Sequence, residues 1–325
     1  MGSGKWSPNT YQARAQKRQT TGQDAFAFSR QASAVHPALN PYGLEVRESR
    51  DTDEHPDSNA IIVGLDVSGS MGKTVRAIHK DLPHLLGLLQ GRQYVPHPQI
   101  MFAAFSNGSC DHVPVQVGQF ESDNRMDENL ENMILGGRLA GGCDIRESAE
   151  LLIYLAARHT STDVWEKRQR KGYLFLITDE MAYEHIKANE IKDIFARDIK
   201  KNIPLQDMIA EASERYHIFV LIPTETSSGK DPKVREFYKA YLDSKHVVLL
   251  ENSDDVSETI ALTIGLTEGN IRLAEGLAHL KESGASEATI NELSKALSLL
   301  DTGSVRGAGG LADMDDKNGG GSRRL

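Results

Sequence analysis

Short runs of consecutive apolar residues constrain the fold of this chain more than any other sequence feature. They cover residues 60–65, 100–105, 174–177, 218–222 and 247–250. Runs of this length are typical of strands buried on both faces, as in a parallel sheet covered by helices. Between them, segments such as 74–89, 145–158 and 205–216 place apolar residues at helical spacing. This alternation predicts an α/β fold with a doubly wound, mostly parallel sheet and helices on both faces.

One antiparallel strand is predicted at the edge of this sheet. Asn107 and Gly108 follow the apolar run 100–105, and this dipeptide is a strong signal for a two-residue hairpin turn. Residues 112–119 then alternate in polarity, as a returning strand does. We therefore expect one antiparallel edge strand beside the parallel ones.

Composition divides the chain into four parts. Residues 1–57 have few branched apolar residues and a basic bias, which predicts a disordered N-terminal arm. This arm is either a plain solvated tail or a basic segment that docks on an acidic partner. Residues 58–266 form the main domain. Residues 270–301 predict a helical hairpin that is either a strap on this domain or an oligomerisation or partner element. The Gly-rich tail, 303–325, is predicted to be disordered.

Charge and cysteine content argue against several classes of protein. The net charge of −9 argues against binding nucleic acid through a general basic surface. The two cysteines, Cys110 and Cys143, are too few for a disulfide framework or a zinc site, and we expect free thiols in a reducing cytosol. No apolar run approaches the roughly 20 residues of a transmembrane helix, and the first residues lack the apolar stretch of a secretory signal. We therefore expect a cytoplasmic protein without nucleic-acid or membrane partners.

The histidines and one basic stretch offer weaker signals. No H-x-x-x-H pattern occurs among the 11 histidines. We interpret the following five as surface or core residues rather than metal ligands: His79, His84, His159, His185 and His217. The stretch 165–171, WEKRQRK, is interpreted as an exposed loop or helix end, with contact to a phosphate or an acidic partner as the alternative.

The strongest chemical signal is the segment 65–72, LDVSGSMG, between the first apolar run and the first helix. Ligands of open α/β sheets bind at the carboxyl ends of the strands, where this segment lies. Asp66, Ser68 and Ser70 can converge on one point if the turn is tight, and Gly69 and Gly72 make such a turn easy. All of these donors are oxygens, which suit a hard cation such as Mg²⁺.

In this position the D-x-S-x-S pattern of Asp66, Ser68 and Ser70 resembles the motif of von Willebrand factor A domains. The resemblance covers residues 58–266 and implies a metal-ion-dependent adhesion site. It also implies an Asp at the end of a later strand, which Asp179 fits, and a Thr from a further loop. Cys143 stands at that Thr position and is a poor Mg²⁺ ligand. Either a water replaces the hydroxyl, or Asp144 does, or the register differs by one residue.

The resemblance also implies a function. In such domains a Glu or Asp of a partner protein completes the coordination of the metal, which we expect to be Mg²⁺, with Mn²⁺ or Ca²⁺ as alternatives. Intracellular relatives with an isolated A domain work beside AAA+ ATPases. We therefore expect a metal-dependent protein-binding adaptor coupled to an AAA+ ATPase, and not an enzyme. A structural or assembly component that uses the same site is the alternative.

Two enzymatic functions have weaker support in the sequence. The run 69–74, GSMGKT, resembles a phosphate-binding P-loop, but Val67 stands where that loop needs its first Gly. A haloacid-dehalogenase-like phosphotransferase would use Asp66 as nucleophile and Thr178 to bind phosphate. Such enzymes usually have a second Asp two residues after the first as acid–base catalyst, and this chain has Ser68 there.

Overall fold

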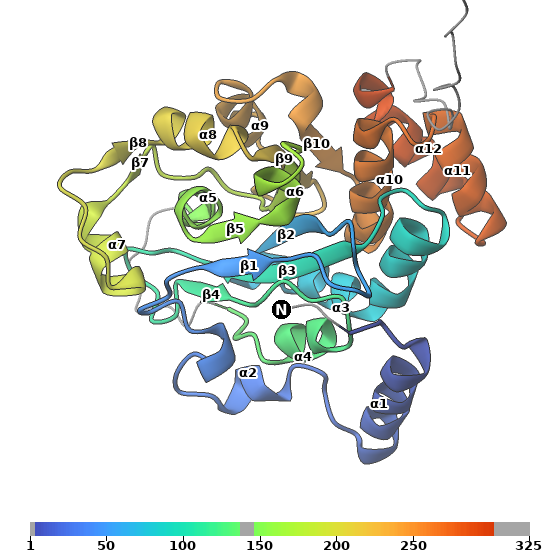
Figure 1. Ribbon diagram of the computed structural model, residues 1–325, viewed down its shortest axis with the longest axis horizontal. Helices are drawn as coiled ribbons and strands as arrows, with labels where there is room; N and C mark the ends of the chain where they lie inside the picture. The colour runs from blue at the N-terminus through green and yellow to red at the C-terminus, as the bar shows by residue number, and fades with distance from the viewer. Residues whose placement is uncertain (1–3, 137–145, 302–325) are drawn as a thin grey trace, which may run out of the picture.

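The computed structural model describes residues 4–136 and 146–301. Its central sheet has six strands in the order β10-β9-β6-β2-β3-β4 (Figure 1). They are β2 (Asn59–Asp66), β3 (Pro98–Phe105), β4 (Val115–Val117), β6 (Gly172–Ile177), β9 (Tyr216–Pro223) and β10 (Val247–Leu250). Neighbouring strands are parallel except β4, which pairs antiparallel with β3 at the edge. The predicted fold class is therefore confirmed.

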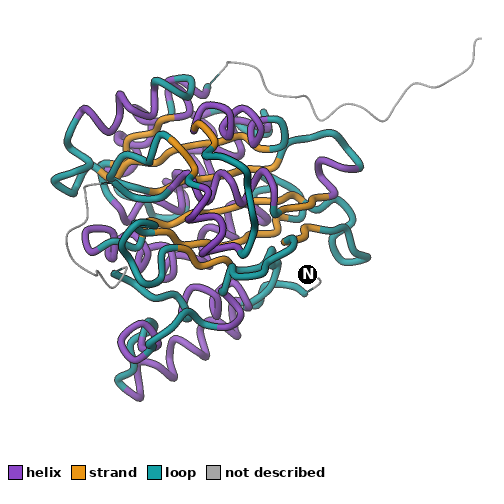
Figure 2. The backbone as a smooth tube through the Cα atoms, turned by 90° about the vertical axis from the view of Figure 1, so that its left-hand side faces the viewer, coloured by secondary structure: helices purple, strands orange, loops and turns teal. Residues whose placement is uncertain are grey.

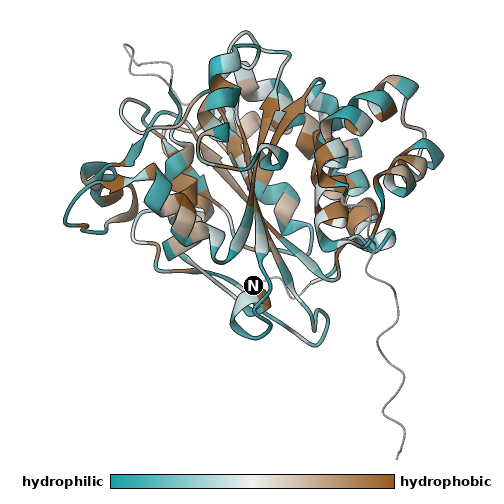
Figure 3. Ribbon diagram, turned by 90° about the horizontal axis from the view of Figure 1, so that it is seen from above, coloured by the Kyte–Doolittle hydropathy of each residue, from teal (hydrophilic) through white to brown (hydrophobic). Residues whose placement is uncertain are grey.

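Both faces of the sheet are buried under helices, as Figures 2 and 3 show. Along β2, Ile61 and Val63 join one apolar cluster while Ala60 and Ile62 join the other, because side chains of a strand alternate between faces. The first cluster includes residues of α3 (Gly72–Leu86), α4 (Arg125–Glu131) and α10 (Val256–Glu268). The second includes residues of α5 (Ala149–Arg158), α7 (Ala188–Phe195), α8 (Leu205–Ser213) and α9 (Pro232–Lys239).

Shorter elements complete the fold. They are β1 (Arg47–Ser49), β5 (Thr160–Thr162), α6 (Asp163–Glu166), β7 (His185–Ile186), β8 (Ile203–Pro204), the turn η2 (Gly69–Met71), the π-helical turn η3 (Gly87–Gly91), η4 (Ser244–His246) and η5 (Ser253–Asp255). No helix among the described residues is long and apolar enough to span a membrane.

Gly64 in the middle of β2 allows α5 to pack closely on the sheet. A Cβ atom at this position would lie 2.5 Å from Leu152 Cδ1 and 3.2 Å from the carbonyl oxygen of Phe175. Leu152 belongs to α5 and Phe175 to the neighbouring strand β6. Only glycine therefore fits here without moving the helix.

The predicted tight hairpin between β3 and β4 is wrong, although the antiparallel pairing is right. β3 ends at Phe105 and β4 begins at Val115, so the connection is longer than two residues. Asn107 starts a turn in which its carbonyl accepts hydrogen bonds from the amides of Cys110 and Asp111. The polar Asn107 and Gly108 thus begin a loop and do not form a whole hairpin turn.

The N-terminal arm is ordered where it is described, which differs from the predicted disorder. Its helices are α1 (Pro8–Thr21), α2 (Ala27–Gln31) and η1 (Pro37–Leu39), and β1 pairs with β5. Arg14 forms an ion pair with Glu128, and Arg18 forms one with Glu131. Both acids belong to α4. The basic arm therefore docks on an acidic partner within its own chain.

One contact of the arm depends on a proline inside α3. Pro83 has no amide hydrogen, so the carbonyl of His79, four residues earlier, lacks its usual helical donor. The Tyr11 hydroxyl donates to that carbonyl at 2.9 Å and approaches the Lys80 carbonyl at 3.1 Å. Burial, with Asp127 as the next cause, raises the pKa of Tyr11 to about 12. The hydroxyl thus stays protonated and able to donate.

The predicted helical hairpin consists of α11 (Leu273–Glu282) and α12 (Glu287–Ala296), followed by η6 (Ser298–Leu300). Leu280, Leu293 and Leu297 are buried in the same apolar cluster as α3 and α10, and Figure 1 shows the pair beside α10. These contacts favour the strap over the oligomerisation element. The predicted tail, 303–325, lies outside the described residues.

The basic stretch 165–171 is compensated within the chain. Arg168 forms an ion pair with Asp51 at 2.9 Å, and Lys167 pairs with Asp163 at 2.7 Å. Arg170 contacts Glu268 at 3.5 Å. These contacts favour a structural role for the stretch over the binding of an external phosphate.

Candidate metal centre

The residues predicted to bind a metal meet at the carboxyl ends of β2 and β6. β2 lies between β3 and β6. After β2 the chain continues to β3 on one side of it, and it later adds β6 on the other side. This switch point is where ligands of open α/β sheets bind. The amide of Val67 donates to Phe105 of β3, and that of Thr178 donates to Leu221 of β9. The sheet therefore fixes Asp66 and Asp179 at one edge.

Asp66 is the last residue of β2 and is fully buried. One carboxylate oxygen accepts a hydrogen bond from the Ser68 amide at 2.8 Å, and the other accepts one from the Thr178 hydroxyl at 2.7 Å. Burial, with the charge of Asp179 as a lesser cause, raises the pKa of Asp66 to about 7, although the hydrogen bonds from Ser68 and Thr178 oppose this shift. Thr178, which the sequence linked only to a phosphate site, orients the Asp66 carboxylate.

Asp179 follows Thr178 just after β6, and its carboxylate lies next to that of Asp66 in the fold. The residue is fully buried, and neither oxygen has a hydrogen-bond partner among the described residues. An unpaired buried charge is costly, and buried charges are normally paired or coordinate a metal. The unsatisfied Asp179 oxygens beside Asp66 therefore fit a bound cation.

Two serine hydroxyls extend from the buried carboxylates toward solvent. The chain turns through η2 immediately after β2, which brings the hydroxyl oxygens of Ser68 and Ser70 to 3.4 Å from each other. Ser68 is half-buried and Ser70 is exposed. The predicted set thus has charged groups at its base and neutral oxygens at its mouth. This arrangement leaves a bound cation open to a ligand from outside.

The loop predicted to complete the site, including Cys143 and Asp144, lies outside the described residues. The residues on either side of this gap contact the site region. The amide of Gly136 donates to Val67 at 2.6 Å, and that of Glu147 donates to Met181 at 3.2 Å. These contacts place both described ends of the loop near the predicted ligands.

Glu147 is an acidic neighbour of the site that the sequence did not indicate. Burial, followed by the charge of Asp66 and those of Glu180, Asp111 and Asp179, raises its pKa to about 10. Glu147 is therefore protonated at neutral pH. Its only sequence signal was its position shortly after the loop 141–144. The carboxyl groups gathered here make the site attractive to a cation.

The cysteine prediction requires a correction. Cys110 is disulfide-bonded, so the expectation of free thiols is wrong for this residue. Cys110 lies in the loop between β3 and β4, close in sequence to Asn107 and Asp111. A count of two cysteines could not decide between a single disulfide and two free thiols.

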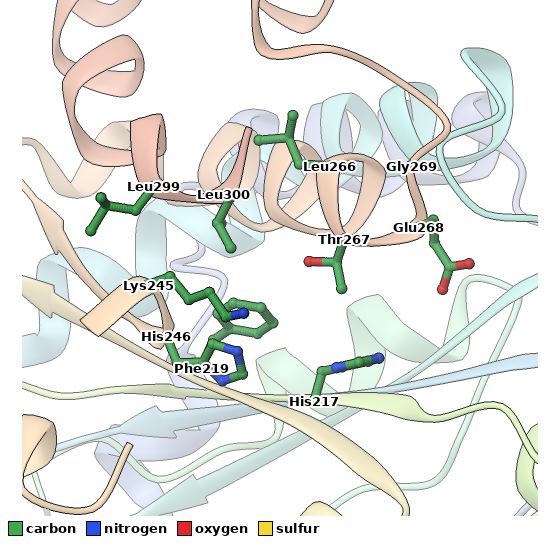
Figure 4. A pocket seen from close by; sticks show the side chains of 10 residues that line it. All are labelled: His217, Phe219, Lys245, His246, Leu266, Thr267, Glu268, Gly269, Leu299 and Leu300. Carbon is green, nitrogen blue, oxygen red and sulfur yellow. The ribbon is translucent and has the colours of Figure 1, made fainter. Parts of the chain in front are cut away.

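A separate pocket of about 270 Å³ lies at the opposite ends of the strands (Figure 4). His217 and His246 line it from the sheet side, Thr267 and Glu268 from the end of α10, and Leu300 from η6. His217 stands near the start of β9, while the metal centre lies at the carboxyl ends of β2 and β6. This pocket is therefore no part of the candidate metal centre.

Comparisons with known proteins give structural similarities only. No protein-family model matches the chain, and no curated protein matches it. The pilus adhesin SpaC of Lactobacillus rhamnosus GG, in an open conformation, matches with TM-score 0.42 and 10% identity over 68% of this chain and 31% of the adhesin. Proximal thread matrix protein 1 of the mussel byssus matches with TM-score 0.40 and 12% identity over 66% of this chain and 48% of its own.

A structure of the same mussel protein with a zinc-occupied metal-ion-dependent adhesion site matches with TM-score 0.38 and 14% identity, over 68% of this chain and 48% of that one. This chain thus spans about a third to a half of the length of these structures. At these identities and TM-scores the similarities carry no inference about function.

Proposed function

We propose that this protein is a metal-dependent protein-binding module of the von Willebrand factor A type. Asp66, Ser68, Ser70 and Asp179 would hold a divalent cation at the carboxyl ends of β2 and β6. An acidic side chain of a partner protein would complete the coordination. The observation that carries the proposal is the buried Asp179 carboxylate beside the buried Asp66, since neither Asp179 oxygen has a hydrogen-bond partner in the part of the chain that the structure describes.

The donor set supports a hard cation. Two carboxylates and two hydroxyls supply only oxygen, which suits Mg²⁺, with Mn²⁺ and Ca²⁺ as alternatives. Mg²⁺ prefers six oxygens and usually keeps several waters. The exposed Ser70 marks the side on which a partner carboxylate could displace such a water. The ion supplies an attachment point for an anionic group, while the chain orients its own carboxylates through Thr178 and the Ser68 amide.

The site supports binding better than phosphotransfer. Both oxygens of Asp66 already accept hydrogen bonds, and the residue is fully buried. Phosphotransfer would also need an acid–base carboxyl group two residues later, where this chain has Ser68. A haloacid-dehalogenase-like activity remains the alternative, and hydrolysis of a chromogenic phosphate ester that is lost in Asp66→Asn would establish it.

The partner class is proposed from the sequence resemblance. An adaptor coupled to an AAA+ ATPase is the first expectation, and a structural or assembly component is the second. A filament or large oligomer held together through this site would favour the second. The two differ in what the site captures: an ATPase, or a further component of an assembly.

A pull-down of three proteins, each in two conditions, tests the proposal. Wild type and Asp179→Asn are compared in Mg²⁺ and in EDTA, and Asp193→Asn is the matched control because Asp193 is an exposed residue of α7. We expect wild type and Asp193→Asn to recover a partner protein in Mg²⁺ but not in EDTA. Asp179→Asn should recover it in neither condition. A partner recovered equally by Asp179→Asn and in EDTA would show that binding uses another surface.

The proposed cytoplasmic location needs its own test. Disulfides persist mainly in oxidising compartments, so the bonded Cys110 makes such a compartment the alternative. Cells lysed under acid would be treated with a thiol-reactive polyethylene glycol. A mass shift for each cysteine would support the reducing cytosol, whereas no shift until a reductant is added would contradict it.

A further inference from the structure

A second group of cation-binding side chains lies between α3 and α10. Asp81 and His84 belong to α3, and Glu258 belongs to the first turn of α10. One potential ligand atom from each residue lies within 4.8 Å of the others. His84 Nε2 and Glu258 Oε1 are 3.5 Å apart.

Helix geometry explains why these side chains meet. Asp81 and His84 are three residues apart, so they share one face of α3. α10 packs against this helix, and the two lie side by side in Figure 1. The three side chains are half-buried, which leaves the group accessible to an ion from solvent.

The carboxylates of this group form no ion pair with a lysine or an arginine of the described residues. Asp81 Oδ2 and Glu258 Oε2 are both buried, and neither has a hydrogen-bond partner within residues 4–136 and 146–301. Burial raises the pKa of Glu258 to about 8, and the charge of Asp81 is the next cause. Burial also raises the pKa of Asp81. In the described residues neither acid forms an ion pair with a lysine or an arginine.

A buried hydroxyl gives an independent indication of a ligand. Ser257, which precedes Glu258, is fully buried, with a relative exposure of 0%. A side-chain interaction with the Ser257 hydroxyl lowers the pKa of Asp81, yet among the described residues no partner of the Ser257 oxygen meets hydrogen-bond geometry. A buried hydroxyl is normally hydrogen-bonded. An ion between the carboxylates would supply the missing interaction.

A similar cluster elsewhere in the fold shows what compensation looks like. His79, Asp127 and Glu131 also bring three potential ligand atoms together. There, however, Arg14 pairs with Asp127, and Arg18 pairs with Glu131. The arginines of the N-terminal arm neutralise this cluster, so it needs no metal. The group on α3 and α10 has no such arginines among the described residues.

We propose that Asp81, His84 and Glu258 bind a divalent transition-metal ion, with zinc as the first candidate. An imidazole nitrogen with two carboxylates suits Zn²⁺ or Mn²⁺ better than Mg²⁺ or Ca²⁺, which prefer oxygen ligands. The ion links α3, which begins just after the loop bearing Ser68 and Ser70, to α10. His84 is then a ligand, contrary to the interpretation of the histidines from sequence.

The test measures bound zinc by equilibrium dialysis of the full chain without an affinity tag, in excess Mg²⁺. The test variants are Asp81→Asn, His84→Gln and Glu258→Gln. Two controls accompany them: His185→Gln, an exposed histidine, and Asp66→Asn, at the other metal centre. We expect wild type and both controls to bind one zinc per chain that the three test variants lose.

Thermal unfolding distinguishes loss of the zinc site from loss of the fold, because a misfolded variant would also bind less zinc. Zinc should raise the Tm of wild type and of the two controls but not of Asp81→Asn. Without zinc, Asp81→Asn should unfold no earlier than wild type, because it removes a half-buried carboxylate that has no lysine or arginine ion-pair partner among the described residues. Equal zinc content in wild type and the three test variants would overturn the proposal. Loss of the bound zinc in Asp66→Asn, with the three test variants unaffected, would also overturn the proposal.

Discussion

The substitution Tyr11→Phe tests how the N-terminal arm is attached. It keeps the ring, which is 8% exposed, and removes only the hydroxyl that donates to the His79 carbonyl at 2.9 Å. Pro83 denies this carbonyl its helical donor, so the acceptor is left buried and unpaired. Such a loss costs about 1–3 kcal/mol. We expect the arm to open separately from the sheet, so that the cost falls mainly on residues 8–21.

Hydrogen exchange followed by mass spectrometry provides the assay. A loss of about 1–3 kcal/mol corresponds to roughly 5- to 150-fold faster exchange of the α1 amides, with little change in β2. Tyr42→Phe is the control, since Tyr42 is 65% exposed. In a Pro83→Ala background, residue 83 regains an amide donor for His79, so Tyr11→Phe should cost less there. Equal costs in both backgrounds, or unchanged exchange in α1, would refute the reasoning.

Two further predictions concern the sheet. Gly64→Ala should destabilise the protein by about 1–3 kcal/mol in urea unfolding, because its Cβ would lie 2.5 Å from Leu152 Cδ1; a smaller loss would mean that α5 moves freely. Burial, with Lys171 next, lowers the pKa of His217 to about 4. The unfolded chain then binds this proton more readily, so His217 lowers stability as the pH falls from about 6.5 to 4. NMR titration should place its midpoint near 4, and a normal midpoint would contradict the burial.

The central strands were predictable because their residues are buried on both faces. The run 60–65 can be identified as a strand from its own residues, without knowing which strands pair with it. Its alternate residues pack on different helices. The same logic placed Asp66 and Asp179 together, since carboxyl ends of parallel strands lie at one edge of a sheet. The physical signal in each case is local in sequence.

The features that the sequence did not indicate depend on polar contacts between distant segments. Arg14 and Arg18 find their acidic partners in α4, more than a hundred residues later. Such pairs leave no periodic apolar pattern, so the arm was interpreted as disordered. Thr178 and Glu147 were missed as neighbours of Asp66 for the same reason: their roles depend on burial and proximity, which a single sequence does not record.

Direct titration with Mn²⁺ tests the central claim, that Asp66 and Asp179 hold a cation. The loss of the free-ion signal in electron paramagnetic resonance reports binding, and a His84→Gln background silences the proposed second site. In this background the account predicts one Mn²⁺ per chain, lost on Asp179→Asn and Asp66→Asn, retained on Asp193→Asn and displaced by excess Mg²⁺. Equal Mn²⁺ binding with and without Asp179→Asn would contradict it.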